Sequence, residues 1–242
     1  MHIADPLAAR TSDPSEPHTS RSMDKSVASL RLQAVAMGGL VIDQVAGSFR
    51  ALLERDPHLA ALVLAREALV NEYERRIDED SLTFIALQQP VANDLRLARA
   101  LVRISRELER VGDESKKIAR FALSFETGTD NAPVVAVARH LRHMASLSVS
   151  MLRSAVLAAD EMDLDKARVV LAQDDELDAE FGSALRLVMS YVLQDHRFLK
   201  PTIDTIFALK GLERVGDHAK NVAEQVLYML GQDPRSVARG AT

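Results

Sequence analysis

The chain has 242 residues, of which 47% are hydrophobic and only 4% aromatic, and it contains no cysteine and no tryptophan. Its 30 Lys and Arg residues against 35 Asp and Glu give a formal net charge of -5, so the composition does not favour nucleic-acid binding, which calls for a basic surface. The lack of cysteine excludes disulfides and thiolate metal sites and fits a cytoplasmic protein.

The two ends of the chain have the composition of tails. Residues 1–20 combine prolines with Ser, Thr and Asp, and residues 233–242 are similarly polar, so both are predicted to be disordered. The N-terminal segment lacks a basic start followed by an apolar run, which argues against a secretory signal. No window approaches the roughly 20 apolar residues that a membrane-spanning helix needs.

Between the tails, apolar residues recur at helical spacing with little strand-like alternation, which predicts an all-α protein. Prolines and the turn cluster Gly128–Pro133 divide this part into six long helices. They are predicted at about 23–56, 57–89, 91–125, 133–160, 163–194 and 201–230. Short connections between long helices favour antiparallel bundles.

One hexapeptide, LERVGD, occurs twice, at Leu108–Asp113 and at Leu212–Asp217. The longer segments LERVGDESKKIA and LERVGDHAKNVA are identical at eight positions. Apolar residues alternate spacings of three and four along both helices, as in packed bundles. We therefore predict an internal duplication of two pseudo-symmetric three-helix bundles, at residues 18–128 and 133–232.

Each copy of the hexapeptide places two carboxylates four residues apart on one helix face, with a glycine between them. These residues are Glu109, Asp113, Glu213 and Asp217, with Gly112 and Gly216. Like charges at this spacing cost about 0.2–0.5 kcal/mol, and each glycine costs about 1 kcal/mol relative to alanine. A cation bound between the two carboxylates would replace their repulsion with attraction. The glycine would let a neighbouring helix approach closely.

A second polar set lies on the middle helix of each predicted bundle. It comprises Glu67, Asn71, Asp174 and Asp178, with Glu74, Asp78, Asp175, Glu176 and Glu180 nearby. Oxygen ligands on two adjacent helices suit hard cations such as Mg²⁺, Mn²⁺ or oxidised iron. The alternative is a solvated acidic face that pairs with Arg110, Arg214 and the lysines around them.

Motifs of several enzyme classes are absent from the sequence. It has no Glu-x-x-His pair, no His-Glu-x-x-His, no glycine-rich phosphate loop and no Gly-x-Ser-x-Gly. His140 and His143 share a helix face, but without a third ligand nearby we expect them on the surface, and His218 likewise. The segment Met37-Gly38-Gly39 indicates close helix packing.

The duplicated LERVGD, together with QQPVANDLRLARALVRISRELERVGD, DDELDAEFGSALRLVMSYVLQD and AKNVAEQVLYML, resembles the PhoU family over about residues 18–232. The resemblance implies two three-helix bundles that carry multinuclear clusters of iron, zinc, manganese or magnesium on Glu/Asp-x-x-x-Asp motifs. The implied ligands are Glu109, Asp113, Glu213 and Asp217, with Asp174, Asp178, Glu67 and Asn71 on the partner helices. Asn71 departs from the acidic pattern of the family.

The same resemblance implies a function without catalysis. It predicts a cytoplasmic, often dimeric adaptor that meets the membrane only through its partners. Those partners would be the ATPase of the phosphate ABC transporter and a sensor histidine kinase, and the adaptor would hold down phosphate uptake and the phosphate-starvation response. The alternatives are a metal-storage or metal-dependent hydrolytic bundle, and a plain helical scaffold.

Overall fold

The computed structural model describes residues 21–124 and 132–233, so nearly all of the predicted tails and most of the predicted turn at Gly128–Pro133 lie outside the described residues. All the regular structure in these two ranges is helical. The elements are α1 (Arg21–Glu54), α2 (Pro57–Ala65), α3 (Glu67–Gln88), α4 (Ala92–Ser124), α5 (Ala132–Ala136), α6 (Ala138–Glu161), α7 (Leu164–Gln194), the 3-10 helix η1 (His196–Phe198) and α8 (Leu199–Met229). The predicted all-α class is confirmed.

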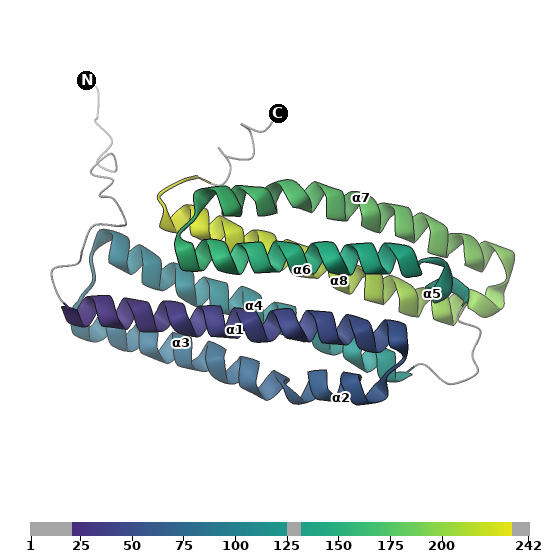
Figure 1. Ribbon diagram of the computed structural model, residues 1–242, viewed down its shortest axis with the longest axis horizontal. Helices are drawn as coiled ribbons and strands as arrows, with labels where there is room; N and C mark the ends of the chain where they lie inside the picture. Colours follow the sequence, from purple (N-terminus) through teal and green to yellow (C-terminus); the bar gives the residue numbers. More distant parts are fainter. Residues whose placement is uncertain (1–20, 125–131, 234–242) are drawn as a thin grey trace, which may run out of the picture.

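The long helices form two bundles that lie side by side (Figure 1). The first contains α1, α4 and the middle pair α2 and α3, and the second contains α6, α7 and α8. The bundles meet where α1 packs on α6 and where α4 packs on α8. The buried apolar side chains form one cluster that continues across both bundles, so the two repeats share a core.

Two of the six predicted helices are broken, which corrects the sequence prediction. The helix expected at 57–89 divides at Arg66 into α2 and α3, and the one expected at 133–160 divides at Val137 into α5 and α6. At Arg66 the backbone forms hydrogen bonds between residues three apart, as in a 3-10 helix. The amide of Arg66 donates to the carbonyl of Val63 at 3.2 Å, and the amide of Leu69 donates to the carbonyl of Arg66 at 3.1 Å. This tighter turn changes the direction of the helix without a proline or glycine.

The other helix boundaries follow local chemistry. Asp56 and Asp163 each accept hydrogen bonds from the amides two and three residues ahead, at 2.9 and 3.0 Å, and so begin α2 and α7. Helix α8 begins at Leu199 and has Pro201 in its first turn. Proline is tolerated there because the amides of the first turn have no hydrogen-bond partner within the helix.

Helix α1 is the most apolar of the long helices. Its segment Ser22–Glu54 is the one helix in the described ranges that is long and apolar enough to cross a membrane by length and composition. This corrects the expectation that no window reaches that level. Half of the window is buried among the other helices, and core helices of bundles have the same composition.

Candidate functional site

The two LERVGD copies lie on α4 and α8, which pack side by side and run antiparallel. The carboxylate of Glu114 accepts a hydrogen bond from Arg214 at 3.2 Å. Seven residues earlier on α4, Glu107 lies 2.8 Å from Nδ1 of His218 and accepts a hydrogen bond from Asn221 at 2.9 Å. These contacts tie the two bundles together through two buried or largely buried glutamates.

The glycines of the motifs mark where the middle helix of each bundle comes closest. A methyl group placed at Gly216 would lie 2.1 Å from Cδ2 of Leu177 on α7, a residue that is fully buried. At Gly112 the corresponding methyl group would lie 3.4 Å from Cγ1 of Val70 on α3, which is an ordinary contact. The second copy is therefore packed more tightly than the first.

This difference predicts opposite effects for one substitution at the two glycines. We expect Gly216→Ala to lower the free energy of unfolding by about 1 kcal/mol, because overpacking costs about 1–3 kcal/mol and the gain in helix propensity is about 1 kcal/mol. Gly112→Ala is expected to leave stability unchanged or raise it by up to about 1 kcal/mol. Urea unfolding of both variants measures the difference, and equal stabilisation of the two would contradict the packing argument.

In the second bundle, four carboxylates face one another across α7 and α8. They are Asp174 and Asp178 on α7, and Glu213 and Asp217 on α8. Burial raises the pKa of Asp217, and the charges of Glu213 and Asp174 raise it further. The pKa of Asp178 is raised by burial and then by the charges of Asp174 and Glu213. Asp178 and Asp217 therefore resist ionisation, first because of burial and then because of their charged neighbours.

Lysines partly neutralise this acidic cluster. Lys220 donates a hydrogen bond to the buried Asp174, and Lys210 donates one to Glu213. The second oxygen of Glu213, Oε2, is buried and has no hydrogen-bond partner. A buried, unpaired carboxylate oxygen is costly, and a cation bound at this point would satisfy it. The donor set thus fits a hard metal ion.

The first bundle repeats the arrangement across α3 and α4 with one change. Lys116, which corresponds to Lys220, donates hydrogen bonds to Glu67 and, at 2.7 Å, to Asp113. The pKa of Glu109 is raised by burial and then by the charges of Asp113 and Glu74. Asn71 follows Glu67 by one turn and is exposed, so this cluster has one carboxylate fewer than its counterpart.

In both bundles a lysine ammonium bonds to carboxylates of the cluster. Within residues 21–124 and 132–233, no three or more His, Asp or Glu side chains are already gathered in a way that would hold a metal ion. The assignment of these residues as metal ligands therefore stays a prediction.

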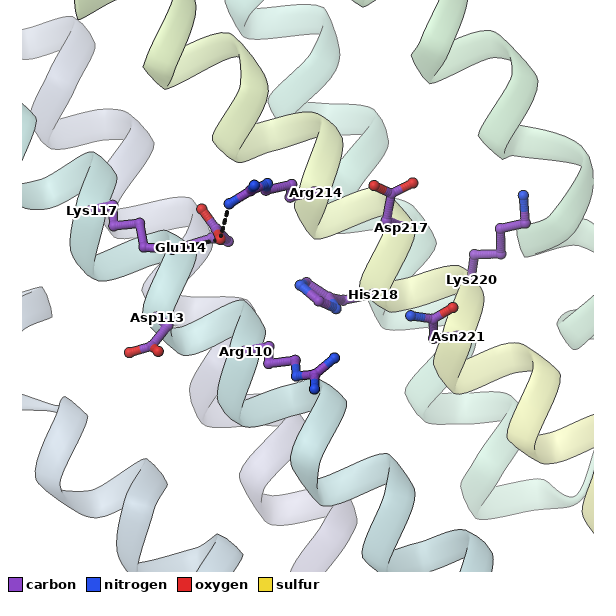
Figure 2. Close-up of a pocket in the computed structure, with 9 residues that line it drawn as sticks. All are labelled: Arg110, Asp113, Glu114, Lys117, Arg214, Asp217, His218, Lys220 and Asn221. Atoms are coloured by element: carbon purple, nitrogen blue, oxygen red, sulfur yellow. Dashed lines mark hydrogen bonds and ion pairs between the residues drawn. The ribbon is translucent and has the colours of Figure 1, made fainter.

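A charged cleft of about 540 Å³ lies between α4 and α8 (Figure 2). Its lining residues are Arg110, Asp113, Glu114, Lys117, Arg214, Asp217, His218, Lys220 and Asn221. The two arginines occupy the same position in the two LERVGD copies, as do the two aspartates. The cleft is thus built from both copies, which is why it cannot be seen in either one alone.

Two histidine predictions are wrong. His218 is not a lone surface residue, because its ring is largely buried against Glu107. Burial pushes the pKa of Glu107 upward, but the hydrogen bonds from His218 and Asn221 outweigh that effect and the pKa is lowered. His140 is also largely buried and bonds to Glu180 at 2.8 Å, whereas His143 is exposed as expected. Neither Glu107 nor Glu180 stood out in the sequence as a partner of these rings.

Solved structures define the class of protein. The crystal structure of PhoU from Pseudomonas aeruginosa matches with a TM-score of 0.79 at 35% identity, over 86% of this chain and 99% of that one. The phosphate transport system regulatory protein PhoU from Streptococcus pneumoniae has the same fold, with a TM-score of 0.78 at 22% identity over 86% and 96% of the two chains. The class is an all-helical protein built from two copies of one bundle.

Sequence comparison identifies the family. The PhoU domain model matches twice, at residues 35–122 and 141–226, one match in each bundle. A PhoU homolog of Pseudomonas aeruginosa, named a phosphate-specific transport system accessory protein, is 37% identical over 91% of this chain and 90% of its own length. The protein of that name from Escherichia coli is 33% identical over 91% and 90%. The chain belongs to the PhoU family.

Proposed function

We propose that this protein is a cytoplasmic negative regulator of phosphate uptake and of the phosphate-starvation response. Its relatives are named accessory proteins of the phosphate-specific transport system, and they align with almost the whole chain. We propose that it acts without catalysis, as an adaptor between the ATPase of the phosphate ABC transporter and a sensor histidine kinase. The observation that carries this proposal is the match of both bundles to the PhoU domain.

The cleft between α4 and α8 is the surface that we assign to a partner. Arg110 contacts Glu107 only at 3.7 Å, and Arg214 makes one contact with Glu114. Both arginine side chains are more than half exposed. Each guanidinium has five N–H donors and leaves most of them available, which suits an acidic surface of a docking protein.

A binding experiment tests this role. The purified chain is incubated with the transporter ATPase subunit and with the cytoplasmic part of the kinase, and the dissociation constant is measured for each. We expect Arg110→Ala/Arg214→Ala to weaken at least one complex by about fivefold or more, the effect of about 1 kcal/mol. Arg168→Ala is the control, because that exposed arginine lies at the start of α7 and outside the cleft. Recovery of neither partner by the wild-type chain would contradict the adaptor proposal.

The carboxylate clusters enter the proposal as metal sites. The unpaired Oε2 of Glu213 and the raised pKa values of Asp178 and Asp217 support a cation there. A bound metal would hold α7 against α8, and α3 against α4, and so stiffen the helices that line the cleft. The identity of the metal is left open among iron, zinc, manganese and magnesium. A homodimer, as the resemblance implies, is also proposed, and the mass in solution tests it.

A further inference from the structure

A second cluster of metal-binding side chains lies on the other side of α7. His140 and His143 are three residues apart on α6, and Glu176 and Glu180 are four residues apart on α7, so each pair projects from one face of its helix. The two faces meet where α6 packs on α7. The buried Leu177 separates these glutamates from the aspartates that face α8.

The donor atoms of the four side chains are close together. Nδ1 of His140 lies 2.8 Å from Oε1 of Glu180. Nδ1 of His143 lies 3.5 Å from the same oxygen, and its Nε2 lies 3.6 Å from Oε1 of Glu176. A tetrahedral zinc ion, with bonds of about 2.0–2.1 Å, holds its donor atoms about 3.3–3.5 Å apart. The observed separations lie on both sides of that value, so small side-chain rotations suffice to surround an ion.

The burial of the four residues shows how such a site would form. The side chains of His140 and Glu180 are 12% and 19% exposed and make a fixed floor. Those of His143 and Glu176 are 48% and 59% exposed and can turn. In the structure both nitrogens of His143 face carboxylates, so the four groups do not yet surround one point. A rotation of this ring would direct a single nitrogen toward the floor.

The chemistry of the donors decides which cation fits. Two neutral imidazoles and two carboxylates together balance the charge of a divalent ion. Imidazole nitrogen suits Zn²⁺, Cu²⁺, Ni²⁺ and Co²⁺, whereas carboxylates alone suit Mg²⁺, Ca²⁺ and Mn²⁺. We propose that His140, His143, Glu176 and Glu180 form a binding site for a divalent transition metal such as Zn²⁺, separate from the carboxylate clusters and independent of the proposed regulatory function.

Copper provides the sharpest test, because nitrogen ligands split its electron paramagnetic resonance signal. The full chain, freed of metal with a chelator, is titrated with Cu²⁺ and with Zn²⁺. We expect nitrogen hyperfine coupling in the wild type and its loss in His140→Ala/His143→Ala, with Zn²⁺ affinity reduced by at least about tenfold. Replacement of only the exposed His143, as His143→Gln, is expected to lower Zn²⁺ affinity and to leave the circular dichroism spectrum unchanged.

Two control variants separate this site from other ligands. His196→Ala removes an almost fully exposed histidine in η1, just after α7, and should leave Zn²⁺ affinity unchanged. Asp217→Asn alters the carboxylate cluster and should leave the nitrogen coupling unchanged. Nitrogen coupling that persists in the double histidine variant, or Zn²⁺ affinity equal to that of the wild type in His143→Gln, would overturn the proposal.

Discussion

Replacing Gly38 with alanine is expected to lower the free energy of unfolding by about 1–2 kcal/mol, and the same change at Gly39 to raise it by up to about 1 kcal/mol. A methyl group at Gly38 would lie 2.6 and 2.8 Å from the two Cγ atoms of Val156 on α6. Valine has one preferred χ1 rotamer in a helix, so rotation cannot relieve the clash and the helices must separate. At Gly39 a methyl group meets no atom within 4 Å, and only the gain in helix propensity remains.

The two adjacent glycines are therefore a matched pair on one helix. Urea unfolding of Gly38→Ala and Gly39→Ala, monitored by circular dichroism, should give shifts of opposite sign. Shifts of the same sign would show that α1 and α6 are not held as closely as the structure describes. A result as expected would also show that the contact between the two bundles contributes to the stability of the whole chain.

Glycine recurs at the other contact between the bundles. A methyl group at Gly211 of α8 would lie 3.1 Å from Cδ1 and Cγ1 of Ile118 on α4. Both inter-bundle contacts thus use a glycine against a branched aliphatic side chain. The sequence gives a reason to suspect close packing at Met37-Gly38-Gly39, but only the structure shows that Gly38 faces α6 and that Gly39 faces solvent.

Much of the fold could be predicted because its signals are local. Asp56 and Asp163 cap helices through their own next residues, and the repeated hexapeptide reveals two equivalent bundles without any knowledge of packing. The breaks at Arg66 and Val137 could not be predicted, because neither position has a proline or glycine. They depend on how neighbouring helices pack, and periodicity along one helix carries no information about that.

The site was less predictable for the same reason. The sequence indicates which carboxylates share a helix face, but not that Lys116 and Lys220 lie among them. Nor does it show that Glu107 and Glu114 of one bundle bind residues 100 or more positions later in the other. Residues that depend on which helix faces meet, such as the largely buried His140, are the ones that sequence reasoning misplaced.

Manganese is expected to raise the midpoint of thermal unfolding of the metal-free wild-type chain by about 5–10 °C when its concentration is a hundredfold above Kd. Binding at that concentration adds about 2.7 kcal/mol, and each kcal/mol corresponds to about 2–4 °C in a chain of this length. Asp217→Asn is expected to lose the part of this shift that comes from the cluster across α7 and α8, because it removes one of the four facing carboxylates. Differential scanning calorimetry with and without Mn²⁺ measures both.

Without metal, Asp217→Asn should not lower the stability of the chain. The pKa of Asp217 is raised in the folded chain by burial and by Glu213 and Asp174, so its negative charge opposes folding at neutral pH. This loss of stability is fully present above the pKa of Asp217 in the folded chain. It disappears as the pH falls below the pKa of Asp217 in the unfolded chain. The amide of Asp217→Asn removes it, so the metal-free variant should be as stable as the wild type or more stable, by less than about 1 kcal/mol for this exposed group.

The response to Mn²⁺ distinguishes a metal site from a salt-bridge network. If the cluster served only to pair with Lys210 and Lys220, which bond to Glu213 and Asp174, Mn²⁺ would affect wild type and Asp217→Asn equally. Asp165→Asn is the control, because Asp165 is almost fully exposed at the start of α7, outside the cluster, and should keep the full Mn²⁺ shift. A metal ion and the lysines compete for the same oxygens, so strong binding requires that the ion gain more from four carboxylates than the ammonium groups lose.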